Sequence, residues 1–487
     1  MNVTPRPQES AERSAVALNP DHPPGGQSPH RLPGPGRRFR RALRTSGVEP
    51  LARILGCSAI SLVILAWAKL TGSLVAANAR AARRRAAHAR IAQRWVQLLG
   101  DLRGAYAKAG QFAATRPDLV PAEAAAPLAT LRDRLPALPL PEIQGVIESE
   151  LGVAVHEAFT DFEPTPLGAA SIAQVHRATL PGGIPVAVKV QYPWIEASLP
   201  ADLKGLRWLG RILLRLGNRG PWLPDLDRFF AEFNAGLADE LDFRAEARAA
   251  SEIAENLADD PGIRVPTIVP SHSGRRVLTM HYHPCVGIAD REGLDKLGVD
   301  PAQVLEIVAR AYARQIFADG LFHADPHPGN LFVLDEEGAD ENPRVLFVDF
   351  GLHRRLSPEL RREMRQGIFA LMQRDADRFI EHMKALDMIA PGAEGGVHDA
   401  VSEMLERIAD EGGAGTLMSA SGGQVLGIKD EAKRLLQDTP GLQLPNDLLL
   451  YVKTLAYLFA LGEELAPEVD LMKISVPYLL QFLAGQD

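Results

Sequence analysis

The pattern of hydrophobic positions divides the first third of the chain into three parts. Residues 1–46 lack apolar periodicity and are rich in Pro, Gly, Ser and Arg, which predicts a disordered tail. An apolar run at 54–77 is interrupted only by Lys69. Arginine-rich and then helical patterns follow. We therefore predict an apolar and basic, membrane-proximal helical segment at 47–92 and a helical extension at 93–165.

The pattern changes at residue 166 to short β-branched runs separated by turns. SIAQVHRATL and IPVAVKVQY flank Pro181-Gly182-Gly183, which predicts a β-hairpin. RVPTIVPS and RRVLTMHYH predict a second strand pair, with SHSG as its turn. Farther along, helical patterns dominate, except for the short apolar runs NLFVL and RVLFVDF. The order of elements predicts a sheet-rich unit with inserted helices at 166–287 and a helix-rich unit at 288–487.

Composition narrows the classes of function. The chain has 487 residues, a net charge of −8 and 6% aromatic residues, so nothing indicates a nucleic-acid-binding surface. Only two cysteines occur, which excludes a disulfide scaffold and fits a reducing compartment such as the cytoplasm. The sequence assigns no oligomeric state.

Basic clusters lie at both ends of the apolar run 54–77, RRFRRALR before it and RAARRRAAHAR after it. A span of the bilayer needs roughly 20 apolar residues, so this run crosses only if Lys69 reaches the interface or the helix tilts. The alternative is a buried or amphipathic helix of the soluble body. Because the arginines concentrate at the ends, membrane association is favoured, while the charges on both sides give no orientation.

The segment HADPHPGN, residues 323–330, allows two chemical interpretations. His323, Asp325 and His327 alternate along the chain as a metal site would, but no second cluster of suitable ligands appears elsewhere in the sequence. Asp325 and Asn330 also have the spacing of the catalytic base and the metal-binding amide in a kinase loop. Asp349 of VDFG follows an apolar strand and would be the main Mg²⁺ ligand. Phosphoryl transfer is the better interpretation, with His323 as a structural brace.

Other residues of a phosphoryl-transfer site appear in the expected order. PLGAAS contains Gly168, Ala169, Ala170 and Ser171, a turn of small residues where the backbone could approach phosphates. Lys189 lies at the end of an apolar strand and needs an anionic partner if it faces inward. Glu240, Asp242 and Glu246 are three candidates for that partner, and sequence alone does not choose among them.

Together these motifs resemble the UbiB or AarF family of atypical protein-kinase-like proteins. The most specific element is AYAKAGQFAATRPDLVP, which carries the family's Lys-x-Gly-Gln motif at Lys108 to Gln111. PLGAASIAQVHRA resembles the alanine-rich loop that replaces a glycine-rich loop in this family. Glu240 and Asp242 match its Glu-x-Asp motif, and Glu246 then falls at the position of the carboxylate that pairs with Lys189.

The resemblance implies an α+β, two-lobed protein-kinase-like fold with an N-terminal helical extension and a helix-rich C-lobe. It implies that ATP binds with Mg²⁺ between the lobes, near the 168–171 loop, Lys189 and Glu246. Asp349 and Asn330 would hold the metal, and Asp325 would orient the acceptor. Lys108, Gln111, Glu240 and Asp242 would cover the place where a protein substrate binds in ordinary kinases.

The implied function is an atypical kinase or ATPase that acts on a non-protein acceptor. The family is associated with ubiquinone and other prenyl-lipid metabolism, so a prenyl-lipid or quinone-precursor ligand and an inner-membrane location of a cytoplasmic catalytic body are expected. The alternatives are a non-catalytic ATP-binding switch, a small-molecule phosphotransferase of the aminoglycoside-kinase type, and a metal hydrolase.

Two features depart from the family pattern. Position 168 is Gly where many members have Ala, so the loop is expected to be more flexible. Bacterial relatives in ubiquinone synthesis often carry apolar spanning helices at the C-terminus. Here the segments LLLYVKTLAYLFALGEEL and ISVPYLLQFLAGQD are interrupted by charges or too short, so we predict packed C-lobe helices instead.

Overall fold

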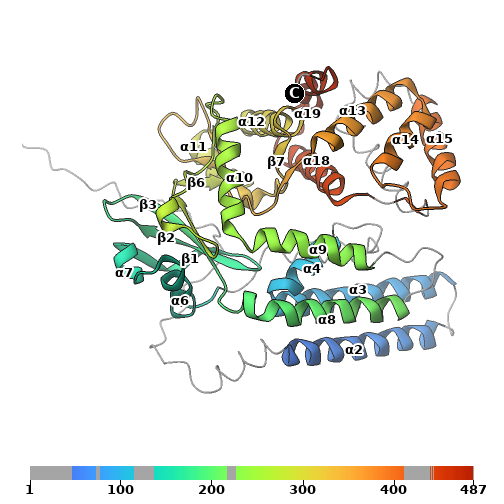
Figure 1. Ribbon diagram of the computed structural model, residues 1–487, viewed down its shortest axis with the longest axis horizontal. Coiled ribbons are helices and arrows are strands. Elements are labelled where there is room, and N and C mark those ends of the chain that lie inside the picture. The colour runs from blue at the N-terminus through green and yellow to red at the C-terminus, as the bar shows by residue number, and fades with distance from the viewer. Residues whose placement is uncertain are drawn as a thin grey trace, which may run out of the picture.

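The computed structural model describes residues 47–72, 77–114, 137–216, 226–410, 439, 441–442 and 444–485. The predicted disordered tail lies outside these residues. The chain forms an α+β, two-lobed kinase-like fold, as expected, with a layer of N-terminal helices along one side (Figure 1).

The N-lobe is built on one antiparallel sheet of four strands. Its strand order is β1-β2-β3-β5, and the strands are β1 (Asp161–Ala169), β2 (Ala173–Thr179), β3 (Pro185–Gln191) and β5 (Val277–His281). Gly182 and Gly183 both have positive φ, so the predicted β2–β3 hairpin forms where glycine permits a tight turn. Two helices, α6 (Leu140–Leu151) and α7 (Val155–Ala158), belong to a core with the valines of β3.

The second predicted strand pair forms only as a short antiparallel pairing. Its first half contributes only β4 (Ile263–Arg264), which pairs in parallel with a C-lobe strand. Ile268 then makes a single bridge to Met280, and Pro270–His272 is a short 3₁₀ turn. The Val269 N–H donates to the Thr279 carbonyl, but the Thr279 N–H donates to Ser273 Oγ instead of returning to Val269, so the ladder stops there.

A layer of helices packs beneath the sheet and shares one hydrophobic core. It contains α2 (Val48–Gly72), α3 (Ala77–Leu102), α4 (Gly104–Ala114), α8 (Ile195–Leu216) and α9 (Leu226–Glu240). A Cβ on Gly205 would lie 2.6 Å from the Tyr106 hydroxyl, so glycine is what allows α8 to approach α4 this closely. In Figure 1, α2 is the outermost helix of this layer.

The C-lobe is mainly helical and encloses the largest core. Helix α10 (Phe243–Asn256) of the N-lobe packs Ala249, Ala250 and Ile253 into this core. The helices of the C-lobe in chain order are α11 (Arg291–Leu297), α12 (Pro301–Ala313), η3 (Arg314–Asp319), α13 (Pro358–Gln373), α14 (Ala376–Ala385), α15 (Glu394–Asp410), α18 (Asn446–Leu465) and α19 (Leu471–Leu483). Residues of α18 and α19 pack into this core, which confirms the prediction that the C-terminal segments are C-lobe helices.

Two small sheets carry the loops of the candidate site. One has the order β4-β9-β8-β6, and the other pairs β10 with β7. The additional strands are β6 (Cys285–Gly287), β7 (Leu321–His323), β8 (Leu331–Leu334), β9 (Val345–Phe347) and β10 (His353–Arg355). HADPHPGN joins β7 to β8 and includes the short turn η4 (Pro328–Asn330), while VDFG follows β9. Both loops therefore leave the sheets close to each other.

Candidate active site

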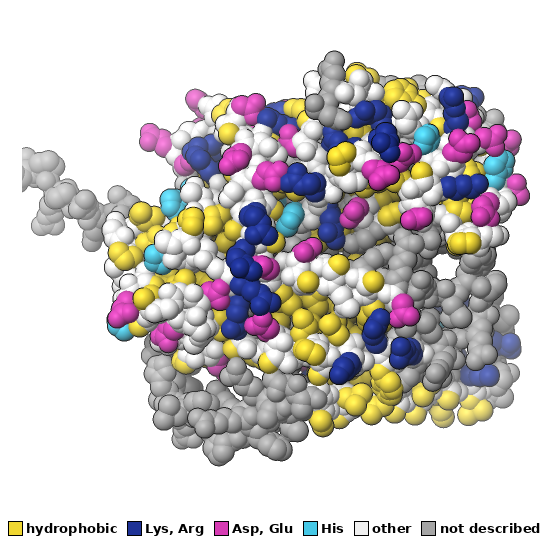
Figure 2. Space-filling view, viewed as in Figure 1, with side chains coloured by type: hydrophobic (Ala, Val, Ile, Leu, Met, Phe, Trp, Pro, Cys, Tyr) yellow, Lys and Arg dark blue, Asp and Glu magenta, His cyan; other side chains and the backbone are white. Residues whose placement is uncertain are grey.

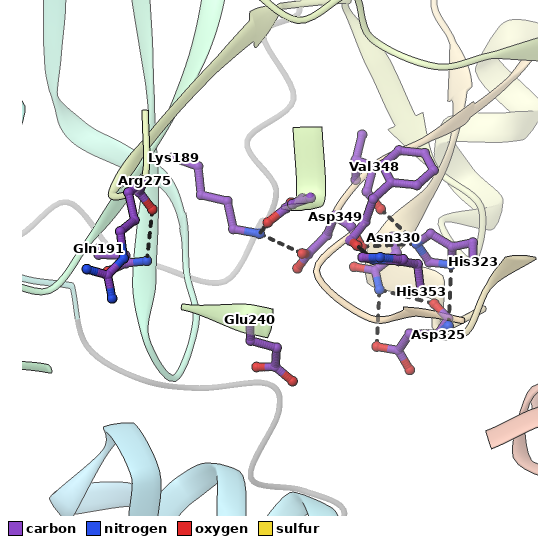
Figure 3. Close-up of polar contacts among 12 residues, drawn as sticks. Lys189, Gln191, Glu240, Arg275, His323, Asp325, Asn330, Val348, Asp349 and His353 are labelled. Atoms are coloured by element: carbon purple, nitrogen blue, oxygen red, sulfur yellow. Dashed lines mark hydrogen bonds and ion pairs between the residues drawn. The ribbon is translucent and has the colours of Figure 1, made fainter. Parts of the chain in front are cut away.

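Lys189 extends from the N-lobe sheet toward a loop of the C-lobe. The valines of β3 are fully buried against α6, so strand alternation turns Lys189 to the opposite face. Its Nζ donates to Glu246 Oε1 at 2.7 Å and to Asp349 Oδ1 at 2.6 Å (Figure 3). The ammonium thus joins strand β3, helix α10 and the loop after β9.

Glu246 is the acid that the structure selects as the partner of Lys189. It lies on the buried face of α10, and both of its oxygens accept hydrogen bonds from Lys189, at 2.7 and 2.9 Å. Asp242 instead caps the same helix, because its carboxylate accepts from the backbone N–H of Arg244 at 3.1 Å and from the Arg244 guanidinium. Residue types alone left this choice open, the family resemblance implied Glu246, and the structure brings Glu246 to Lys189.

Asp349 is held in an uncommon backbone conformation beside Lys189. Its φ is +59°, in the left-handed region that non-glycine residues rarely adopt. A Cβ on Gly351 would lie 3.2 Å from Asp349 Oδ1 and 3.4 Å from Glu246 Oε2. Glycine at 351 is therefore what lets the chain turn closely around the ion pairs, and strain of this kind tends to persist where function requires it.

The three charged groups shift one another's pKa. Burial alone would lower the pKa of Lys189, but Asp349 and Glu246 outweigh burial and hold it well above its ordinary value. Burial alone would raise the pKa of Asp349, but Lys189, with a smaller contribution from Lys108, holds it well below. Burial raises the pKa of Glu246 to about 7 although Lys189 opposes the shift. One carboxylate stays ionised, and the other is easily protonated.

The loop HADPHPGN places Asp325 and Asn330 side by side. The Asn330 amide donates to the Asp325 backbone carbonyl at 3.1 Å and to its Oδ2 at 3.2 Å (Figure 3). The backbone N–H of Val348 donates to the Asn330 carbonyl at 3.0 Å, which ties this loop to the segment before Asp349. A carboxylate and an amide oxygen from two neighbouring loops are the donor types that Mg²⁺ prefers.

His323 connects the HADPHPGN loop to the VDFG loop through hydrogen bonds. Its Nε2 donates to the carbonyls of Val348 and Asp349 at 3.2 and 3.0 Å, and its Nδ1 accepts from the Tyr312 hydroxyl at 3.0 Å and the Asp325 N–H at 3.3 Å. Burial lowers the pKa of His323, which suits this neutral tautomer.

The partners of His323 argue against the metal interpretation of HADPHPGN. With both ring nitrogens engaged in the brace, His323 has neither one available as a ligand. Among the described residues, no group of three or more His, Cys, Asp or Glu side chains is placed to hold a metal ion.

Lys108 enters the site from the N-terminal helical layer. It lies on α4 and forms an ion pair with Glu240 at the end of α9. Figure 3 shows Glu240 between the N-terminal helices and the Lys189–Asp349 pair. Gln111 lies one turn farther along α4 and is half-buried. Asp242, which the sequence grouped with Lys108, directs its carboxylate to Arg244 instead.

The alanine-rich loop is anchored at several points. Gly168 and Ala169 are paired residues of β1, and the Ala170 N–H closes a tight turn on the Ala173 carbonyl at 2.8 Å. The Tyr192 hydroxyl donates to the Ala170 carbonyl at 2.9 Å. The Ser171 carbonyl accepts from the first N–H of α4 at 3.0 Å, so the loop and the Lys108 helix are coupled. These bonds restrain the loop that Gly168 was expected to loosen.

One charged residue at the site had no signal in the sequence. Lys453 of α18 lies with its Nζ 3.7 Å from Asp325 Oδ1. Lysine is common on helices, and Lys453 lies 128 positions after Asp325. Only the packing of α18 against the C-lobe core brings them together.

The fold and the site define a class of protein. A buried Lys–Glu pair on the N-lobe, an Asp-x₄-Asn loop and an Asp-Phe-Gly segment on the C-lobe are the elements of a protein-kinase-like molecule. A family model described as the ABC1 atypical kinase-like domain matches residues 130–383. The chain belongs to this family, which includes the proteins named UbiB, and the resemblance inferred from the motifs is confirmed.

Several relatives resemble the chain over most of its length. An uncharacterized protein of Synechocystis is 31% identical over 92% of this chain and 76% of its own. The probable protein kinase UbiB of Marinobacter nauticus is 32% identical, over 78% of this chain and 68% of its own. The chloroplast protein Activity of BC1 Complex Kinase 8 of Arabidopsis thaliana is 30% identical over 78% of this chain, which spans 52% of the plant protein.

Proposed function

We propose that this protein is an atypical kinase or ATPase that binds Mg-ATP between its lobes and hydrolyses it or transfers its γ-phosphoryl group to a non-protein acceptor. The observation that carries the proposal is the position of Lys189. Its ammonium bridges a carboxylate of the N-lobe and a carboxylate of the C-lobe, next to an Asp325–Asn330 pair. Kinase-like sites use this combination to hold phosphates and orient an acceptor.

Each residue has a definite task in this proposal. Lys189 binds the α- and β-phosphates while Glu246 keeps its side chain in place. Asp349 and Asn330 are the residues that would hold Mg²⁺, which would offset the charge of the phosphates. Asp325 accepts the proton of the attacking hydroxyl or water. The backbone at 168–171 lies over the phosphates, fixed by its bonds to Tyr192 and α4.

The N-terminal layer limits which acceptor reaches Asp325. Lys108 and Glu240 join α4 to the end of α9, and the charge of Lys108 reaches Asp349. A folded protein segment would have to displace this pair and its helix, whereas water or a small hydroxyl group would not. We therefore propose that the acceptor is a small molecule, and the UbiB relatives favour one connected with ubiquinone or another prenyl lipid.

Helix α2 is the proposed membrane contact. The stretch Val48–Thr71 is the helix in the described part of the chain that is long and apolar enough to cross a membrane. Trp67 and Val63 are each 67% exposed, and Leu70 is 65% exposed. Figure 2 shows hydrophobic side chains along the edge formed by α2. We propose that this face contacts the inner membrane, with the catalytic body in the cytoplasm and exposed arginines of α3 near anionic headgroups.

The test is ATP turnover by the purified full chain with Mg²⁺. It is measured with and without anionic liposomes and a quinone-like phenol, and compared with the variants Asp325→Asn and Lys189→Met. We expect liposomes or the phenol to stimulate turnover, and both variants to lose it by at least about 100-fold. Asp399→Asn, at a side chain 90% exposed, is the matched control and should behave as wild type.

The outcomes separate the alternatives. Nucleotide binding without turnover would replace the proposal with an ATP-binding switch. Wild-type turnover in Asp325→Asn would show that the base is assigned wrongly. Turnover that is intact but indifferent to liposomes and phenol would remove the lipid part alone.

A further inference from the structure

The catalytic loop contains no cation of its own. HADPHPGN has neither Lys nor Arg between Asp325 and Asn330. Phosphoryl transfer places negative charge on the equatorial oxygens of the moving group, and sites of this class supply a Lys or Arg there. Lys189 already forms ion pairs with Glu246 and Asp349. The charge near Asp325 must therefore come from another part of the chain.

Helix α18 places the positive charge of Lys453 next to Asp325. Lys453 Nζ lies 3.7 Å from Asp325 Oδ1, and the two side chains are only 10% and 18% exposed. The adjacent Thr454 is fully buried, and its hydroxyl donates to the Ala324 carbonyl at 3.2 Å and to the Leu450 carbonyl at 2.8 Å. Two consecutive residues of α18 thus engage two consecutive residues of the catalytic loop.

The position of Lys453 is fixed by packing. Leu458, Leu461 and Leu465 follow Thr454 at helical spacing and are buried in the C-lobe core, so α18 cannot rotate without losing that core. A lysine so shielded from water is costly unless an anion compensates it. The distance to Asp325 is an ion-pair distance, longer than a charged hydrogen bond. At that spacing one reacting group beside the pair can contact both charged atoms.

We propose that Lys453 is a catalytic residue whose ammonium contacts the γ-phosphoryl oxygens of ATP next to Asp325. This inference rests on the proposed function. Asp325 takes the proton of the attacking hydroxyl or water, and the attacking oxygen bonds to the γ-phosphorus. The bond from that phosphorus to the β–γ bridging oxygen breaks, and the oxygen leaves on ADP. Lys453 keeps its proton throughout and donates hydrogen bonds to the γ-phosphoryl oxygens.

The test compares Lys453→Gln with wild type for turnover and for the binding of two nucleotides. A non-hydrolysable ATP analogue has a γ-phosphate, and ADP does not. We expect kcat to fall at least about 100-fold and the analogue to bind about tenfold more weakly, with ADP affinity unchanged within about twofold. Lys453→Arg, which keeps the charge, should recover part of kcat. The matched control Lys473→Gln, at an exposed lysine of α19, should match wild type.

A second measurement needs no variant. In the wild-type protein, the analogue should protect Lys453 from an amine-modifying reagent, read by mass spectrometry, whereas ADP should protect it much less. Equal protection by both nucleotides, or equal weakening of both in Lys453→Gln, would overturn the inference in favour of a structural role. Full turnover in Lys453→Gln while Asp325→Asn is inactive would overturn this inference alone. Full turnover in Asp325→Asn would overturn the proposed function as well.

Discussion

Two lysines approach Asp349 from opposite parts of the molecule, and their surroundings differ. Lys189 comes from the N-lobe sheet, and its side chain and that of Glu246 are 8% and 4% exposed. Lys108 comes from the N-terminal helical layer, and its pair with Glu240 is 23% and 15% exposed. Both lysines help to hold the pKa of Asp349 below its usual value.

The difference in burial separates a permanent ion pair from an adjustable one. Removing one member of a buried ion pair leaves an uncompensated charge in the interior, which typically costs about 3–5 kcal/mol. A solvent-exposed ion pair typically contributes about 1 kcal/mol or less, and the Lys108–Glu240 pair lies between these two cases. Lys189 is therefore required for the shape of the site, whereas Lys108 can separate from Glu240 at a lower cost. The inner pair, Lys189 with Glu246, suits nucleotide binding. The outer pair, Lys108 with Glu240, suits control of access.

The largest expected effect follows from removing the cation of the inner group, which consists of Lys189, Glu246 and Asp349. Lys189→Met leaves the buried Glu246 and the 44% exposed Asp349 close together without a cation. We expect it to abolish ATP binding and to lower the free energy of unfolding by about 3–5 kcal/mol, measured by denaturant titration. The double variant Lys189→Met with Glu246→Gln should recover much of the stability and none of the turnover. Wild-type stability in the single variant would mean that Lys189 does not compensate these carboxylates.

A smaller effect is expected from crowding the same group. In Gly351→Ala the new Cβ would lie 3.2 Å from Asp349 Oδ1, so the ion pairs must shift by a few tenths of an ångström. We expect a stability loss of about 1–3 kcal/mol and a fall in kcat of about tenfold. Gly395→Ala is the matched control, because nothing lies within 4 Å of its new Cβ in helix α15. If the two alanine variants behaved alike, the close turn at Gly351 would have no role.

The ion pairs of the site also show which features the sequence could predict. Short-range signals were sufficient for the β2–β3 hairpin, where Gly182 and Gly183 specify the turn, and for the order of motifs that reveals the kinase-like fold. Pairing across elements was harder. Residue types alone did not distinguish the three acids at 240–246, and only the family resemblance implied Glu246. In the structure, the direction of α10 brings Glu246 to Lys189 and turns Asp242 to cap the helix.

Long-range packing accounts for what the sequence missed. The second predicted hairpin forms only around the Ile268–Met280 bridge, because the Thr279 N–H donates to Ser273 Oγ instead of continuing the ladder, although the apolar pattern suits a longer strand. Lys453 had no local signature at all. Its place beside Asp325 depends on how α18 packs on the C-lobe core, and a helix-forming pattern does not contain that information.

The protonation of Glu246 offers a pH test of the inner group. Its pKa is raised to about 7, above the value of roughly 4.3 for an unfolded chain, so the folded state binds more protons between these values. Stability should therefore fall as pH rises from about 4.5 to 7. In Glu246→Gln this part of the pH dependence should vanish, which melting temperatures across that range would reveal. A wild type and variant with parallel curves would show that Glu246 does not titrate there.

The smallest effect on stability is expected from breaking the outer pair. Lys108→Ala removes the cation from a Glu240 side chain that is 15% exposed, so the free energy of unfolding should fall by about 1–2 kcal/mol, less than in Lys189→Met. The affinity for ADP should stay within about threefold of wild type, because Lys189 and Glu246 are untouched.

If the Lys108–Glu240 pair restricts access to Asp325, Lys108→Ala should transfer phosphate to larger hydroxyl compounds that wild type rejects, measured with radiolabelled ATP and a series of phenols. The exchanged pair Lys108→Glu with Glu240→Lys should restore the restriction. A stability loss as large as that of Lys189→Met, or an unchanged range of acceptors, would remove the distinction between the inner and outer pairs.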